Sequence, residues 1–410
     1  MDRRKFLETM AKGAAWVSVL GPAVIRERLD LGKKSYASTG DRSVRIFVSD
    51  LHLNVDAPYS WLRGNVEPLA RFLNLLKARE DVAELVILGD FLDDWVVPAE
   101  ECPKNLAEIL EAGMNEPVVS ALQELCENSP IAVTYVTGNH DLLSFESSAK
   151  ETILGYFPHM TIISNEPGLG AYALDYGLWA EHGHRYALFN APDVWSRAGG
   201  HLPLGYFISR LSASQSVASG QKLTSPEILQ KALESSKKRL PPTGEKLISA
   251  VFWTVAAWAG KRPWDRFVMN GVDGWGEDPT LAEVDSLYQD IYHEWSKRQD
   301  IVPPGMALAD EFTLEGAALL LLRMPNFIQH QYPFTPQIVI FGHTHKAVLR
   351  KDFGPTRGVY ANTGTWIDGH AMTWVEVLET GGGSVEVSLS FFSDSAAHVL
   401  VSETMPVQGT

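Results

Sequence analysis

Cysteine and basic residues are scarce in this chain of 410 residues. Its two cysteines, Cys102 and Cys126, are weak evidence for a disulfide, and we interpret them as two unrelated free thiols. Lysine and arginine number 35 against 50 aspartate and glutamate, which gives a formal net charge of −15. A non-specific nucleic-acid binder needs a basic face to displace counterions, so this balance argues against that class and leaves only a local basic patch open. The chain also has no G-x-S-x-G motif, so a serine nucleophile has no support.

A long apolar run is also lacking at the N-terminus. The stretch Ala11–Ile25 covers 15 residues, which is too short to span a bilayer comfortably but suits the core of a signal peptide. Arg3 and Arg4 precede it, and Arg-Arg-x-Phe-Leu resembles the twin-arginine export signal, although Asp2 and Glu8 depart from its usual residues.

We therefore predict a signal peptide over residues 1–37, because the small residues before position 38 suit cleavage after Ala37. The protein would be exported to the periplasm, or tethered to the membrane if the segment stays uncleaved. Residues 1–37 hold eight basic and four acidic residues, so the mature net charge would be −19. The alternative is a basic amphipathic helix at the start of a cytoplasmic protein.

Five apolar, β-branched runs each end in a polar cluster. They are SVRIFVSDLH (43–52), AELVILGDFLDDW (83–95), IAVTYVTGNHD (131–141), YALDYGLWAEHGHR (172–185) and QIVIFGHTH (337–345). Their continuous apolar character is typical of strands buried on both faces, and the helical stretches between them suit crossover connections. This order predicts an α/β fold. Ligands in such sheets gather at the carboxyl ends of the strands, where all five clusters lie.

The 158 residues between His184 and His343 differ from the rest, because they are rich in tryptophan and in helical periodicity. We predict one domain over residues 38–410, in which residues 200–330 form a mostly helical insertion that covers the active edge of the sheet. A peripheral addition remote from the site is the alternative. Near the C-terminus, AMTWVEVLE and SVEVSLSFF alternate apolar and polar residues around a glycine-rich turn, which predicts a β-hairpin.

Taken together, D-x-H, GD, GNHD, HGH and GHTH resemble the calcineurin-like metallophosphoesterase superfamily. The resemblance covers residues 44–185 and 337–370. It implies a four-layer α-β-β-α sandwich and two divalent metal ions (Mn, Fe or Zn) that share a bridging carboxylate. Carried over residue by residue, it assigns the first metal to Asp50, His52, Asp90 and His345, and the second to Asp90, Asn139, His182 and His343.

The same resemblance assigns the chemistry to the GNHD segment. A water that bridges two such metals loses a proton at neutral pH and attacks the phosphate ester as hydroxide. His140 would then donate a proton to the leaving oxygen as the general acid, with Asp141 fixing its tautomer. Asp93 is expected to orient ligands, His184 to lie behind them or touch phosphate, and Arg185 to pair with a substrate phosphate or a surface acid.

The sequence defines the substrate less closely. SDLHL and a helical insertion resemble the UDP-diacylglucosamine pyrophosphohydrolases, but that branch has Arg where this chain has His140 and Asp where it has His184. We expect hydrolysis of a small phosphate mono- or diester. Pyrophosphohydrolysis of a nucleotide-lipid is the alternative, and a non-catalytic protein-binding scaffold is a distant one.

Trp253 and Trp258 either line a pocket for an apolar substrate group or belong to the core. The expected partners are therefore a small phosphorylated substrate, with or without an apolar group, and a nearby membrane, but no nucleic acid.

Overall fold

The computed structural model describes residues 43–174, 176–238, 245–298, 301–323, 336–353, 358–380, 383–393 and 395–406. All of them belong to the second of two compact units, Asp41–Thr410. The predicted signal peptide over residues 1–37 lies outside the described residues. Within the described ranges, no helix combines the length and the apolar character that crossing a membrane requires.

The larger of two sheets has seven strands in the order β12-β11-β10-β1-β2-β3-β4. Strands β1 to β4 run parallel, so their carboxyl ends meet at one edge of the sheet. Strand β10 pairs antiparallel with β1 and starts a meander through β11 and β12, which includes the predicted C-terminal hairpin. The strands are β1 (Val44–Val48), β2 (Val82–Leu88), β3 (Ala132–Val136), β4 (Thr161–Ile163), β10 (Met372–Thr380), β11 (Ser384–Ser393) and β12 (Ala396–Pro406).

The smaller sheet has five strands in the order β5-β6-β7-β9-β8. Strands β6, β7 and β9 are parallel, which places the HGH and GHTH segments at one edge of this sheet. The strands are β5 (Tyr172–Leu174), β6 (Leu178–Ala180), β7 (Ile338–Phe341), β8 (Val348–Phe353) and β9 (Gly358–Asn362).

Alternating side chains along the strands build three cores and hence four layers. Phe47 of β1 packs with Ile338 of β7 in the core between the sheets. Its neighbour Ile46 points the other way, toward α3 (Val66–Lys77) and α5 (Glu116–Asn128). Val339 of β7 faces the helices of the insertion in the third core. The expected α-β-β-α sandwich is therefore the observed fold.

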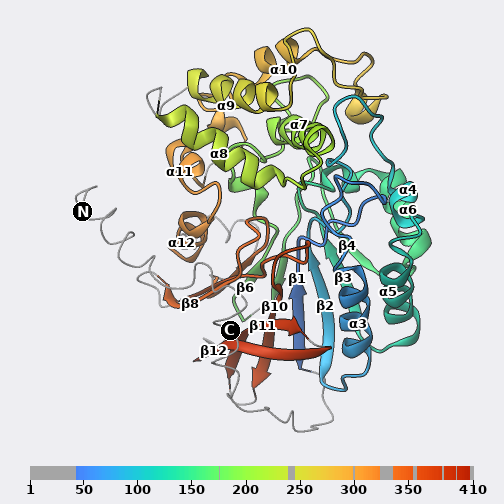
Figure 1. Cartoon of the computed structure of the whole chain (residues 1–410). Helices are drawn as coiled ribbons and strands as arrows, with labels where there is room; N and C mark the ends of the chain where they lie inside the picture. The colour runs from blue at the N-terminus through green and yellow to red at the C-terminus, as the bar shows by residue number, and fades with distance from the viewer. Residues whose placement is uncertain are drawn as a thin grey trace. The chain divides into compact units, whose positions relative to one another are not determined.

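The tract between the HGH and GHTH segments of the smaller sheet forms six α-helices among its described residues. They are α7 (Leu204–Ser219), α8 (Ser225–Lys237), α9 (Glu245–Trp258), α10 (Leu281–Tyr288), α11 (Pro304–Ala309) and α12 (Glu315–Arg323). Figure 1 shows α7 to α10 gathered at the top of the view, with α3 and α5 beside the larger sheet on the right. One apolar core joins Phe207 of α7 and Phe252 of α9 to Tyr360 of β9, so the helices are packed onto the smaller sheet. Cys102 is exposed and Cys126 buried, and both are free thiols, as interpreted from the sequence.

Candidate metal centre

The polar clusters lie in the loops that follow the carboxyl ends of strands from both sheets. They come from β1 (Asp50, His52), β2 (Asp90), β3 (Asn139, His140), β6 (His182) and β7 (His343, His345). Six of the seven predicted ligands form two groups of converging donor atoms, Asp50–His52–Asp90–His345 and Asp90–His182–His343. The seventh, Asn139, joins the second group through its amide oxygen.

The backbone at these positions adopts a conformation that side-chain-bearing residues rarely take. The left-handed region, with φ between 51° and 69°, is occupied by Asp50, His52, Asp90, His343 and His345. Each such residue costs about 1–3 kcal/mol, so the surrounding structure must hold these loops in place. Strain of this kind is concentrated at functional sites.

Two glycines allow the loops to approach one another. A Cβ on Gly138 would overlap the carboxylate of Asp90, and a Cβ on Gly342 would overlap Ser49 and the carboxylate of Asp50. The glycine of GNHD and the glycine of GHTH are therefore required by the close packing around the two carboxylates.

The first group surrounds a buried carboxylate oxygen. His345 Nε2 lies 3.1 Å from both Asp50 Oδ1 and His52 Nε2, and Asp90 Oδ2 lies 3.7 Å from His52 Nε2. His52 donates its Nδ1–H to Asp93 at 3.0 Å, so its Nε2 turns toward the group. Asp50 Oδ1 is buried and accepts no hydrogen bond from the described residues. Metal–ligand bonds of about 2.0–2.2 Å place neighbouring ligand atoms roughly 3.0–3.6 Å apart, so this donor set fits a divalent cation.

The second group is built around Asn139 and Asp90. His182 donates its Nδ1–H to the carbonyl of Leu88 at 2.7 Å, which leaves Nε2 facing Asn139 Oδ1 at 3.0 Å and Asp90 Oδ2 at 3.2 Å. His343 Nδ1 lies 2.8 Å from the same Asn139 oxygen. A nitrogen lone pair that faces two oxygens is repelled unless a proton or a cation lies between them. Asp90 belongs to both groups, which is the position that a bridging ligand needs.

Charges within the centre shift the pKa values of its members. Burial alone would raise the pKa of Asp50, but the imidazoles of His345 and His182 hold that pKa below its usual range. Burial would lower the pKa of His52, but the carboxylates of Asp50 and Asp93 raise it to about 10. Asp90 and Asp50 likewise outweigh burial and raise the pKa of His182 to about 9. In the metal-free chain, protons supply the positive charge that a divalent cation would supply in their place.

His140 is held by Asp93 rather than by Asp141. Its Nδ1–H donates to Asp93 Oδ1 at 2.9 Å. Asp141 instead accepts hydrogen bonds from the backbone amides of Gly138 at 2.6 Å and Phe91 at 2.8 Å. The prediction that Asp141 fixes the tautomer of His140 is therefore wrong, because Asp141 closes the GNHD turn and faces away from the imidazole that precedes it.

Two tryptophans that belong to no recognised motif pack against the same imidazole. The ring centroid of His140 lies 5.2 Å from that of Trp61 and 4.8 Å from that of Trp95. Both indoles are buried, and Trp61 also lies 4.8 Å from the ring of His52. These indoles restrict the ring and exclude water from its faces. Trp95 follows Asp93 closely in the chain, but no sequence signal marks Trp61.

His184 and Arg185 lie beside the centre and do not join it. The ring of His184 lies 5.4 Å from that of His182, and its Nε2 is 3.0 Å from the carbonyl of Gly168. Burial and the charge of His182 lower the pKa of His184 to about 3, which makes it a neutral neighbour. Arg185 pairs with Glu181 at 3.2 Å and donates to the hydroxyl of Tyr186 at 2.6 Å. Its guanidinium is thus engaged inside the protein and does not line the cavity over the metal centre.

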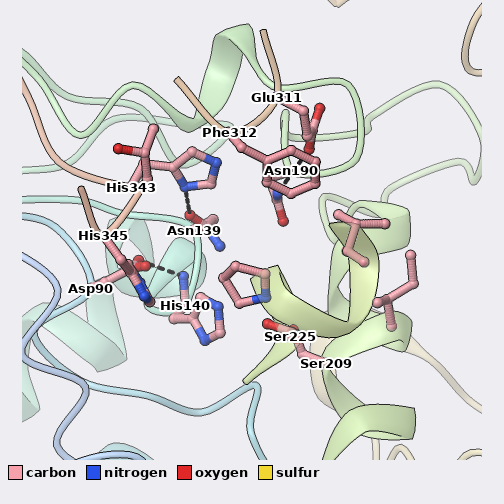
Figure 2. Close-up of a pocket in the computed structure, with 15 residues that line it drawn as sticks. Asp90, Asn139, His140, Asn190, Ser209, Ser225, Glu311, Phe312, His343 and His345 are labelled. Carbon is pink, nitrogen blue, oxygen red and sulfur yellow. Dashed lines mark hydrogen bonds between the residues drawn. The ribbon is translucent and has the colours of Figure 1, made fainter. Parts of the chain in front are cut away.

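That cavity has a floor from the strand-end loops and walls from the insertion (Figure 2). The floor residues are Asp90, Asn139, His140, His343, Thr344 and His345. The walls include the first turns of α7 and α8, so part of the insertion covers the site. Trp253 and Trp258 do not line it: Trp253 donates to Asp285 at 2.9 Å and packs on the helical core, and Trp258 is 40% exposed.

A four-layer sandwich with these side chains gathered at its strand ends has the architecture of a metallophosphoesterase. The calcineurin-like phosphoesterase family model matches residues 45–232, which supports this superfamily. The match contains the motifs from Asp50 to His182 and ends before His343. The GHTH loop lies outside the match, and strand β7 of the smaller sheet brings it to the site.

The other comparisons add no argument about function. No curated protein matches the chain. Among solved structures, "GAP50 the anchor in the inner membrane complex of Plasmodium" has a TM-score of 0.32 and 10% identity, with 90% of each chain covered. A likeness of that size supports no further conclusion.

Proposed function

We propose that this chain hydrolyses phosphate esters with the help of two bound divalent metal ions. The observation that carries the proposal is the pair of converging donor groups that share Asp90, together with the buried Asp50 oxygen that accepts no hydrogen bond from the described residues. The family match over residues 45–232 supports the same class of reaction. The ions would polarise phosphate oxygens and lower the pKa of a water.

His140 is the group that would protonate the leaving oxygen. Asp93 engages its Nδ1, so the transferable proton sits on Nε2, and His140 lines the cavity in which the ester would lie. Trp61 and Trp95 restrict the ring to one orientation. These three neighbours therefore position one proton donor at the edge of the metal centre.

The first test measures metals and turnover together. Purified full-length chain, loaded in parallel with Mn²⁺, Fe²⁺ or Zn²⁺, is given a panel of phosphomonoesters, phosphodiesters and nucleotide-lipids. We expect two ions per chain and hydrolysis of a mono- or diester. Asp90→Asn should lose both ions and slow turnover by orders of magnitude, because one oxygen of this carboxylate serves each ion.

Asp285→Asn is the matched control, because this acid lies on α10, its carboxylate accepts from the indole of Trp253 at 2.9 Å, and it does not line the cavity. It should keep both ions and normal turnover. Two ions with normal turnover in Asp90→Asn would contradict the shared ligand. Turnover confined to the nucleotide-lipid would favour the pyrophosphohydrolase alternative, and a metal-loaded chain that hydrolyses no ester would favour the scaffold.

A further inference from the structure

The cavity over the metal centre has room for a small molecule only. Its volume is about 460 Å³, including the part open to solvent. A nucleotide-lipid with acyl chains would need space outside it, whereas a phosphate ester of a short alcohol fits within it.

The walls differ in chemistry from the floor. Four apolar side chains and two hydroxyls come from the insertion: Ile208, Pro226, Leu229, Phe312, Ser209 and Ser225. Among the described residues that line the cavity, none is lysine or arginine. A substrate with a second phosphate or a carboxylate would bury that charge without a cation of the protein to pair it, which is costly. Positive charge is thus confined to the metal centre.

One carboxyl group stands in this wall, that of Glu311. It is 2% exposed and accepts hydrogen bonds from the backbone amides of Leu188 at 2.5 Å and Phe189 at 3.3 Å. The side-chain amide of Asn190 also donates to it at 3.2 Å. Burial raises the pKa of Glu311 to about 8, so above that pH the group is an ionised carboxylate that only accepts hydrogen bonds. Figure 2 shows Glu311 and Asn190 together in the upper part of the view, above His140 and to the right of His345.

Neutral amides fix the position of this carboxyl group and leave its side facing the cavity to a ligand. Three N–H groups donate to it, and that of Phe189 is shared between the two oxygens. The two oxygens of an ionised carboxylate offer about four acceptor sites, so Glu311 can still accept one hydrogen bond from a substrate. The amide oxygen of Asn190 is a further acceptor beside it. Two acceptors beside apolar side chains select a hydrogen-bond donor over either an anion or a methyl group.

We propose that the cavity binds a phosphomonoester of a short alcohol that carries no second anionic group and that presents a hydroxyl or an ammonium group to Glu311 and Asn190. The phosphate lies at the metal centre, and the carbon chain packs against Ile208, Leu229 and Phe312. The proposal rests on the proposed phosphoesterase function and names its class of substrate. Hydroxyl and ammonium share the donor chemistry, and the test below separates them.

Four esters of equal length test the proposal with metal-loaded full-length protein at pH 9, where Glu311 is ionised. They are the monophosphates of butanol, propanediol, aminopropanol and hydroxypropionic acid, which end in a methyl, hydroxyl, ammonium and carboxylate group. A hydrogen bond to a charged group contributes about 1.5–3 kcal/mol, so the better of the hydroxyl and ammonium esters should exceed the butyl ester at least tenfold or so in kcat/KM. The carboxylate ester should be the poorest substrate.

Glu311→Gln should remove this preference. The new amide would turn a donor toward the cavity, so the best ester should fall to the level of the butyl ester and the carboxylate ester should gain. Asp310→Asn is the matched control, because Asp310 is the adjacent buried acid and bonds the backbone of Gly316 at 2.7 Å, but does not line the cavity. It should keep the wild-type order of substrates. Ratios of kcat/KM do not depend on the fraction of folded enzyme, so a loss of stability leaves the test valid.

The outcomes separate this inference from the proposed function. Equal kcat/KM for all four esters would overturn the inference and leave the proposed function standing. The same change in substrate preference in Glu311→Gln and Asp310→Asn would have the same consequence. Hydrolysis of an activated aryl phosphate with none of the four esters accepted also overturns the inference alone. Failure to hydrolyse any phosphate ester overturns the proposed function and the inference with it.

Discussion

The carboxylate of Asp93 holds two imidazoles that have different tasks. Its Oδ2 accepts from His52 at 3.0 Å and its Oδ1 from His140 at 2.9 Å. The backbone amide of Val96 donates to Oδ1 at 2.9 Å and fixes the carboxylate itself. Such a partner sets the tautomer and the orientation of each ring. One residue therefore links the candidate proton donor to the metal ligands.

Asp93→Asn should weaken proton donation more than it weakens binding. An asparagine cannot accept from both rings through charged oxygens, so the imidazolium of His140 loses its counter-charge. We expect turnover of an alkyl phosphate to fall by about 10²–10³-fold and turnover of an activated aryl phosphate, whose leaving group needs no proton, to fall much less. The measurement is the ratio of kcat for the two esters.

Asp141→Asn is the comparison that separates the two carboxylates. Asp141 accepts from backbone amides with both oxygens, so the new side-chain amide would face an N–H donor and cost roughly 1–3 kcal/mol of stability. The ratio of the two esters should stay at the wild-type value. A changed ratio in this variant and an unchanged ratio in Asp93→Asn would restore Asp141 as the orienting residue.

The sequence predicts which residues supply the metal ligands better than it predicts which residues contact and orient those ligands. Each ligand lies directly after a strand, and continuous apolar runs mark the strands. Because parallel strands have their carboxyl ends at the same edge of a sheet, the ligands are expected to lie close together. The partner of His140 does not follow in this way, because residues adjacent in a tight turn point in different directions. Asp93 reaches His140 across two loops, which only the fold brings together. Trp61 illustrates the same limit, because its contacts with His52 and His140 are all tertiary.

At the scale of elements, the start of α8 connects a local sequence signal to the cavity. Thr224 and Glu227 form a capping box there, and Ser225, Pro226 and Leu229 of the first turns line the cavity. Thr224→Ala should cost about 1 kcal/mol and let the first turn fray. We expect KM for the preferred ester to rise several-fold while the metal content stays unchanged.

Thr280→Ala is its matched control, because Thr280 and Glu283 form the same capping box at α10. This helix does not line the cavity, so the variant should lose similar stability in thermal unfolding with KM unchanged. Equal KM values in both variants would show that the first turn of α8 does not shape the binding site.

The elements themselves were predictable to different degrees. The runs ending at Val48, Leu88, Val136 and Phe341 became strands because they are buried on both faces in the sandwich. The run 172–185, predicted as one strand, instead forms two antiparallel strands of three residues each, β5 and β6, because apolar runs that short do not show where a strand ends. Strand β12 was not predicted, because it is mostly exposed at the edge of the sheet and has no clear alternation. The helices of the insertion were visible as periodicity, but their position over the site depends on tertiary packing.

At the scale of the whole molecule, the metal centre places several carboxylates inside the fold, where burial of charge is costly. The chain is acidic overall, yet its metal centre buries carboxylates beside imidazoles that attract protons.

Export of the protein by residues 1–37 stays a prediction, because that segment lies outside the described residues. N-terminal sequencing of the protein isolated from cell fractions would decide it: Met1 retained on an entirely cytoplasmic protein would contradict export.

The pKa shifts of His52 and His182 predict how pH acts on the protein with and without metal. Their folded-state values of about 10 and about 9 lie above the ordinary value of 6.5. A raised pKa contributes stability that is fully present below the unfolded value and is lost as pH rises through the folded value. The metal-free protein should therefore lose stability between about pH 6.5 and 10. Metal-bound imidazoles are neutral, so the stability of the metal-loaded protein does not fall in this pH range for this reason.

The gap in Tm between the loaded and the chelated protein should accordingly widen from pH 7 to pH 9. Glu311, whose pKa is raised to about 8, loses its proton in the same pH range in both the loaded and the chelated protein. Its effect on Tm therefore cancels in the difference between them. The combined affinity for the two ions should rise with pH, by up to about a hundredfold per unit where two protons are displaced. Thermal unfolding and metal titration measure the two effects separately. A gap that narrows as pH rises would mean that these two imidazoles do not exchange their protons for metal.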